Sequence, residues 1–159
     1  MAVQSLPPLR MIAPLRSASE VTAGSERPAE LSALANWPIQ LRLVPPHAPF
    51  LRGADLLLVA DCVPFAMADF HRRLLRGRPV VIGCPKLDDG QAYAEKLAAI
   101  LTTSDVHSVT IVHMEVPCCT GLVRIAEAAV QRSGRNVPLN DVTISIRGQV
   151  IGPESLPVK

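Results

Sequence analysis

Hydrophobic and polar positions along this chain form blocks that predict short buried strands separated by helices. The run 54–60 is apolar at every position except Asp55. A continuous apolar run of this length is typical of a strand that is buried on both faces of a parallel sheet. The other predicted strands are 39–44, which ends at a pair of prolines, 79–84, 109–116 and 141–147. The last of these alternates between polar and apolar residues, as an edge strand does.

Apolar residues at helical spacing predict helices between these strands. The segment 91–101 places Tyr93 and Leu97 on one side of a helix, together with the apolar residues that follow. The segment 121–132 has the same pattern, and Gly134 just after it is a typical helix stop. The remaining predicted helices are 30–36 and 63–75.

Strands and helices that alternate in this way predict βαβ units with right-handed crossovers. We therefore expect a doubly wound α/β fold of the Rossmann or flavodoxin-like type. It would have a mostly parallel sheet of four to five strands and helices on both faces. Residues 1–30 are rich in Pro, Ser, Ala and Glu and predict a flexible or disordered arm. The α/β domain is then expected at 31–152, with a tail at 153–159.

Composition narrows the classes of function. Hydrophobic residues make up 48% and charged residues 19%, which excludes disorder along the whole chain. The net charge of +2 and the aromatic content of 3% argue against a nucleic-acid-binding protein. No apolar run reaches the roughly 18 residues that a membrane span needs. Prolines at positions 7, 8 and 14 interrupt the N-terminal segment, so a secretory signal is not expected and the predicted location is cytoplasmic.

The four cysteines all follow predicted parallel strands. Cys62 comes just after the strand 54–60, Cys84 ends the next strand, and Cys118 and Cys119 follow the third. In an open α/β sheet, the carboxyl ends of the strands form the edge where ligands bind. We therefore expect the four thiols to share one site there. The alternative is that they are small hydrophobic residues without a common role.

The adjacent cysteines Cys118 and Cys119 help to decide which kind of metal centre the sequence favours. Zinc sites typically use two CxxC-type knuckles, and this chain has none. Cys118 and Cys119 would reach two irons of a cubane more easily than one small ion. The pair also precedes Gly121, the predicted start of a helix, and a helix N-terminus stabilises anionic sulfur. These features favour an iron–sulfur cluster, with 4Fe–4S the preferred type, held by Cys62, Cys84, Cys118 and Cys119.

Two other interpretations stay open at this point. The same thiols would suit a metal-binding or metal-delivery protein that takes zinc, copper or nickel. They would also suit a thiol redox enzyme in which Cys118 or Cys119 attacks a substrate. Nucleotide binding is not supported, because neither GxGxxG nor GxxxxGK[ST] is present. No residue set predicts acid–base catalysis, so no catalytic residue is assigned.

The residues around the cysteines also resemble a known family. The motifs ADC-x-x-F-x-x-x-x-FH, GCPKLDD and EVPCC lie within a stretch of about residues 36–151. This stretch resembles the C-terminal domain of bacterial and archaeal 4Fe–4S ferredoxin-type iron–sulfur cluster-binding oxidoreductases. Most members carry an N-terminal ferredoxin module, whereas residues 1–35 of this chain contain no cysteine.

The resemblance implies electron transport or redox sensing rather than a self-contained enzyme. It also implies a redox partner protein. Arg72, Arg73, Arg76 and Arg78 form a basic cluster that is either a solvated face or a docking site for an acidic redox partner. An exposed cluster would be compatible with a homodimer.

Overall fold

The computed structural model describes residues 31–151, which contain a five-stranded sheet with the strand order β2-β1-β3-β4-β5. β1 is parallel to both neighbours, β2 and β3, and β3 is parallel to β4, whereas β5 is antiparallel to β4. The strands are β1 (Asp55–Ala60), β2 (Val80–Gly83), β3 (Ser108–Met114), β4 (Leu139–Ile144) and β5 (Val150–Ile151). The predicted arm at 1–30 and the tail at 153–159 lie outside the described residues.

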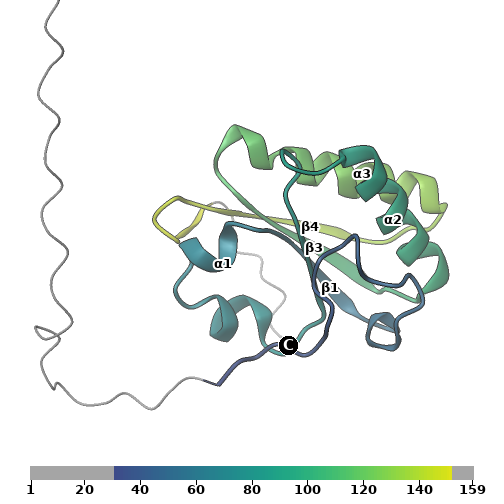
Figure 1. Ribbon diagram of the computed structural model, residues 1–159, viewed down its shortest axis with the longest axis horizontal. Helices are drawn as coiled ribbons and strands as arrows, with labels where there is room; N and C mark the ends of the chain where they lie inside the picture. The colour runs from purple at the N-terminus through teal and green to yellow at the C-terminus, as the bar shows by residue number, and fades with distance from the viewer. Residues whose placement is uncertain (1–30, 152–159) are drawn as a thin grey trace, which may run out of the picture. The chain divides into compact units, whose positions relative to one another are not determined.

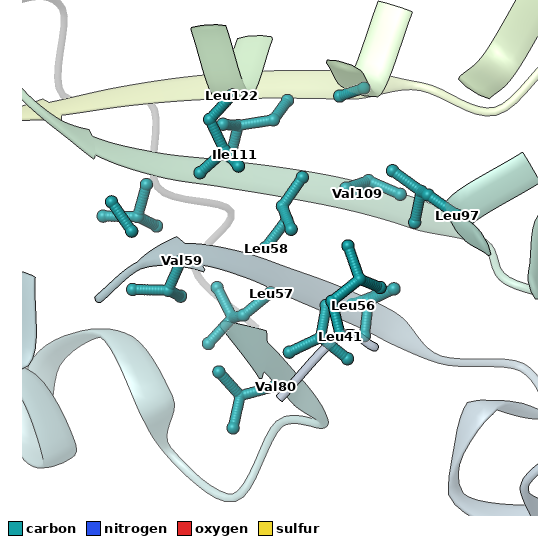
Figure 2. Packing of buried hydrophobic residues seen from close by; sticks show 14 of the residues in the cluster. Leu41, Leu56, Leu57, Leu58, Val59, Val80, Leu97, Val109, Ile111 and Leu122 are labelled. Atoms are coloured by element: carbon teal, nitrogen blue, oxygen red, sulfur yellow. The ribbon is translucent and has the colours of Figure 1, made fainter. Parts of the chain in front are cut away.

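β1 is the central strand of the core, as its apolar run predicts. Every residue from Leu56 to Val59 is fully buried. Figure 2 shows these side chains in one cluster with Leu41, Val80, Ile111 and Leu122. Burying one Leu or Val side chain stabilises a fold by about 1.5–3 kcal/mol. A strand with apolar residues on both faces therefore takes the middle of the sheet.

Helices cover both faces of the sheet. α2 (Gly90–Thr103) and α3 (Gly121–Ser133) lie side by side on one face, and α1 (Val63–Ala66) lies on the other (Figure 1). The chain moves from β1 to β2 in one direction and from β2 to β3 in the other. Right-handed crossovers then place the connecting helices on opposite faces. The predicted doubly wound α/β fold is confirmed.

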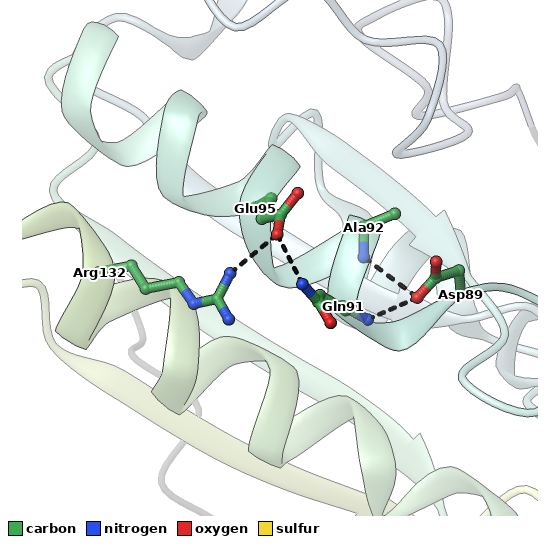
Figure 3. Close-up of polar contacts among 5 residues, drawn as sticks. All are labelled: Asp89, Gln91, Ala92, Glu95 and Arg132. Carbon is green, nitrogen blue, oxygen red and sulfur yellow. Dashed lines mark hydrogen bonds and ion pairs between the residues drawn. The ribbon is translucent and has the colours of Figure 1, made fainter.

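The position of α2 is fixed at its start and along its exposed side. The Asp89 carboxylate accepts hydrogen bonds from the main-chain N–H groups of Gln91 (2.9 Å) and Ala92 (3.3 Å), which caps the helix (Figure 3). Glu95 on α2 forms an ion pair with Arg132 on α3 at 3.3 Å. This pair is solvent-exposed, so it adds little to stability, and packing of the two helices contributes more.

The single helix predicted at 63–75 is wrong. The segment contains the one-turn helix α1, an extended residue at Met67, and η3 (His71–Leu75), a single π-helical turn. Gly148, in the turn between β4 and β5, lies directly against the main chain of Ala66 and Met67. Its left-handed backbone (φ 79°) has no room for a Cβ there. The turn between β4 and β5 therefore packs against the point where α1 ends.

Three other predicted elements also differ from the structure. Residues 31–36 of the predicted helix 30–36 are not helical. The predicted strand 39–44 contributes one parallel bridge, from Gln40 to Ile82, and then turns. The predicted edge strand 141–147 is β4, which is not at the edge because β5 pairs with its outer side. The first two segments contact residues far away in the sequence, through Asn36 to Val80 and Gln40 to Ile82, whereas the third error arises because the short strand β5 was not predicted.

Candidate thiol site at the carboxyl edge of the sheet

The structure places all four cysteines beyond the carboxyl ends of parallel strands. Ala60 of β1 and Gly83 of β2 are partners in the sheet register, so the chain leaves the sheet there on two adjacent strands. Cys62 and Cys84 follow those two residues. Cys118 and Cys119 follow β3, the neighbour of β1 on its other side.

This edge contains the point where the direction of the chain across the sheet reverses. The connections from β1 and from β3 leave on opposite faces, and doubly wound folds bind ligands in the crevice between two such strands. Cys62 follows one of these strands, and Cys118 and Cys119 follow the other. Thiols thus flank the switch point from both sides.

Cys118 and Cys119 differ sharply in exposure although they are adjacent. They belong to η4 (Pro117–Cys119), a single 3₁₀ turn in which the Cys119 N–H donates to the Val116 carbonyl at 3.0 Å. The side chain of Cys118 is exposed, whereas Cys119 is only 4% exposed. The turn therefore directs one thiol to solvent and the other into the protein.

Burial is the main reason that the pKa of the Cys119 thiol is raised. A hydrogen bond with the main chain of Met114 acts in the opposite direction. The nearby thiols of Cys118 and Cys62 raise the pKa of Cys119 further. Cys62, from the end of β1, is thus within electrostatic range of the pair that follows β3. All these cysteines are free thiols.

Cys84 is connected to the same region through its neighbour. A Cβ placed on Gly121, the first residue of α3, would lie 3.0 Å from the Cβ of Pro85. The chain just after Cys84 therefore touches the chain just after Cys119. Cys84 itself is half-buried.

The four thiols share an edge but do not form the coordination sphere of a single ion. Within residues 31–151, no three His, Cys, Asp or Glu side chains lie close enough together to hold one metal ion. The assignment of the four cysteines as ligands stays a prediction.

Comparison with known proteins places this fold in a family. A family model described as a Rossmann-like domain matches residues 48–159. The chain belongs to this Rossmann-like family. It is 32% identical to an uncharacterized protein of Archaeoglobus fulgidus over 120 residues, which cover 76% of this chain and 84% of that protein. No solved structure shows a significant match. In the part of the Rossmann-like domain that the structure describes, no helix is long and apolar enough to span a membrane.

Two carboxylates of this Rossmann-like domain, Asp61 and Asp88, lie beside the cysteines. The Tyr93 hydroxyl donates a hydrogen bond to the Asp88 carboxylate at 2.6 Å, and Arg42 lies 3.8 Å from the other Asp88 oxygen. Burial raises the pKa of Asp61, the neighbour of Cys62, and the charge of Asp88 raises it further. The Oδ1 atom of Asp61 is buried and has no hydrogen-bond partner in the described part of the chain.

His113 is the buried histidine of the domain, on β3. Its Nδ1 lies 2.9 Å from the Met114 carbonyl oxygen, and its Nε2 lies 3.0 Å from a carboxylate oxygen of Asp141 on β4. These contacts make it a link between the two strands. It binds β3 to β4 close to the edge that carries the thiols.

The basic cluster 72–78 has local partners for most of its side chains. Arg72 forms an exposed ion pair with Asp69 at 3.5 Å. Arg76 donates to the Arg72 carbonyl at 3.3 Å, and Arg78 donates to the Leu74 carbonyl at 2.7 Å. These contacts tie the arginines to their own turn.

Proposed function

We propose that this chain binds an iron–sulfur cluster through Cys62, Cys84, Cys118 and Cys119 and serves in one-electron transfer or redox sensing. The observation that supports the proposal best is the placement of thiols on both sides of the switch point. The resemblance of the cysteine motifs to the C-terminal domain of 4Fe–4S ferredoxin-type oxidoreductases supports it independently. A 4Fe–4S cluster is the preferred type, because the adjacent pair would reach two different irons.

The chemistry of the donors is compatible with such a cluster. Ionisation of Cys119 is opposed by its burial and by its neighbours Cys118 and Cys62. Cationic iron would remove that penalty, since metal ligation requires the thiolate. α3 begins at Gly121, two residues after Cys119, and the N–H groups of a helix N-terminus favour negative charge on nearby sulfur.

The different exposures of the cysteines suit electron transfer. When bound, an iron–sulfur cluster supplies a one-electron redox couple. Cys119 lies on the buried side of the site, next to the core, and would keep that side free of water. Cys62 and Cys118 are exposed and would provide the route to a redox partner at the surface. A homodimer through this edge and a cytoplasmic location are further parts of the proposal.

Anaerobic purification with metal analysis tests the proposal directly. We expect a brown protein with a broad absorption band at about 400 nm and with about four iron and four sulfide ions per chain. An electron paramagnetic resonance signal should appear on reduction or oxidation. A colourless protein with one bound ion per chain would instead support a metal-binding or metal-delivery role. A colourless, metal-free protein that consumes peroxide or disulfide would support a thiol redox enzyme.

Single Cys→Ser variants identify the ligands. Each of Cys62→Ser, Cys84→Ser, Cys118→Ser and Cys119→Ser should reduce the iron content or change the resonance spectrum, because a serine oxygen is a poor substitute for a thiolate. Thr102→Ser, which lies in the last turn of α2, is the control and should retain the cluster unchanged. Full iron content with an unchanged spectrum in any one cysteine variant would remove that residue from the ligand set.

A further inference from the structure

The loop that follows β2 carries Cys84 and is closed by two hydrogen bonds. The main-chain N–H groups of Leu87 and Asp88 both donate to the Cys84 carbonyl, at 3.2 Å and 3.0 Å. Cys84 is therefore the first residue of a tight turn that ends at Asp88. The position of Cys84 depends on whatever holds the two ends of this turn.

Tyr93 on α2 contacts both ends. Its side chain is only 1% exposed, and its ring lies where Gly83 would carry a Cβ, which would be 2.7 Å from Cζ and from the hydroxyl oxygen. The hydroxyl donates to the Asp88 carboxylate at 2.6 Å. The ring thus packs before Cys84, and the hydroxyl binds the residue that closes the turn after it.

The hydroxyl has a role separate from the ring. A phenylalanine would fill the same space in the core, yet this position has a polar atom aimed at the loop. Burial is the main reason that the pKa of Tyr93 is raised, and the hydrogen bond to Asp88 raises it further. The hydroxyl therefore stays protonated and can donate. The N-terminal cap of α2 is made by Asp89, so Asp88 is not needed for the cap.

We propose that Tyr93 is a positioning residue for Cys84, acting through Asp88. Its hydroxyl holds the Cys84–Asp88 turn against α2, and its ring requires glycine at position 83. The part of this inference that concerns a bound cluster rests on the proposed function. The part that concerns the placement of the thiol does not, so the two can be tested apart.

The reactivity of the thiols in the metal-free chain is the first test. Tyr93→Phe removes the hydrogen bond and keeps the ring. We expect iodoacetamide to modify Cys84 about tenfold faster in this variant, because a hydrogen bond to a charged group contributes about that factor to closure of the turn. The rates at Cys62 and Cys118 should not change. Mass spectrometry of the modified peptides separates the sites.

Variants at the acceptor distinguish positioning from general loss of structure. Asp88→Ala should accelerate Cys84 at least as much as Tyr93→Phe, because it removes the same hydrogen bond and also the exposed contact with Arg42. The double variant should be no faster than Asp88→Ala alone. Asp88→Asn keeps an acceptor oxygen but loses the charge, so the Cys84 rate should lie between those of the original chain and Tyr93→Phe, at about threefold above the original. Asp89→Asn is the control, since the Asp89 side chain caps α2 through the N–H groups of Gln91 and Ala92 and makes no hydrogen bond with the Tyr93 hydroxyl. Equal Cys84 rates in all variants, or equal acceleration at every cysteine, would overturn the proposal.

The loaded protein provides a second readout. If the original chain takes up a cluster, Tyr93→Phe should shift its reduction potential or its resonance spectrum, and Asp88→Asn, which keeps the Tyr93 hydroxyl and an acceptor oxygen, should cause a smaller shift. An unchanged potential and spectrum together with unchanged Cys84 reactivity would refute the role of Tyr93 and leave the cluster intact. A chain that binds no cluster but shows the selective Cys84 effect would refute the proposed function and leave the role of Tyr93 intact.

Discussion

Pro85 and Gly121 are in direct contact, although they lie in different crossover connections. A Cβ on Gly121 would be 3.0 Å from the Cβ of Pro85, which is closer than side chains ordinarily approach. Pro85 follows Cys84, and Gly121 follows the segment with Cys118 and Cys119. This contact brings two cysteine-bearing loops together at the edge of the sheet, and it depends on the absence of a side chain at Gly121.

Gly121→Ala should therefore destabilise the protein. Alanine is favoured over glycine in helices by about 1 kcal/mol, but the rigid proline ring has to move to admit the methyl group. We expect a net loss of about 1 kcal/mol in the free energy of unfolding, measured by urea denaturation. Gly90→Ala, at the first residue of α2, is the matched control, because its Cβ would make an ordinary contact of 3.6 Å with Ile125. Equal changes in the free energy of unfolding for Gly121→Ala and Gly90→Ala would show that the contact with Pro85 is not the cause.

Gly83→Ala should cost more than Gly121→Ala. The new methyl group would overlap the ring of Tyr93, which is buried, so the ring or the main chain would have to shift. Overpacking of this kind typically costs about 1–3 kcal/mol. If the ring is the cause, Gly83→Ala should cost much less in a Tyr93→Leu background, so the two changes would be non-additive. Urea denaturation of the two single variants and the double variant measures this coupling, and additive losses would argue against it.

The sequence was most informative for β1, because the apolar residues of this strand alone indicate that both of its faces are buried. The apolar run 54–60 predicted a strand buried on both faces, and β1 is that strand. The prediction failed at 63–75, because the contact between Gly148 and Ala66 involves residues far apart in the sequence. Hydrophobic spacing alone contains no information about such an approach.

The candidate site, too, could be predicted from the sequence only in part. The position of the cysteines after strands could be predicted, because strand ends follow from the apolar pattern. The burial of Cys119 beside an exposed Cys118 could not, since it depends on the 3₁₀ turn that starts at Pro117. Tyr93 was predicted on the apolar side of its helix, and it does lie there. The hydroxyl partner Asp88 becomes visible only when the loop is placed in three dimensions.

His113→Leu should destabilise the link between β3 and β4. The substitution keeps an apolar volume but leaves the Met114 carbonyl and the Asp141 carboxylate without their ring partner. Loss of a buried hydrogen-bond partner costs about 1–3 kcal/mol, which urea denaturation resolves. His47→Leu, at an exposed position in a loop, should change stability by no more than about 0.5 kcal/mol. A loss at His47 as large as that at His113 would show that histidine removal itself, and not the cross-strand link, is responsible.

Asp105 gives a prediction about pH. A hydrogen bond from Arg135 at 2.7 Å, reinforced by the Arg135 charge, holds the pKa of Asp105 below its ordinary value. Between the lowered folded pKa and the ordinary unfolded pKa, the folded state binds fewer protons than the unfolded state. The contribution of Asp105 to stability is thus present above the unfolded pKa and is lost as the pH falls through the folded one.

Asp105→Asn should therefore lower the melting temperature at about pH 7, and the difference from the original chain should shrink as the pH falls through the folded pKa of Asp105. The effect should be small, because the Asp105 side chain is 73% exposed and its ion pair is screened by solvent. Glu127→Gln, at another exposed carboxylate, on α3, is the control and should show no such pH-dependent difference. If the deficit of Asp105→Asn stayed constant as the pH was lowered through the acid range, the cause would be the amide itself and not the charge. The Arg135 guanidinium also donates to the carbonyls of Leu101 and Ser104 at the end of α2, so Arg135→Gln should cost more than Asp105→Asn at every pH.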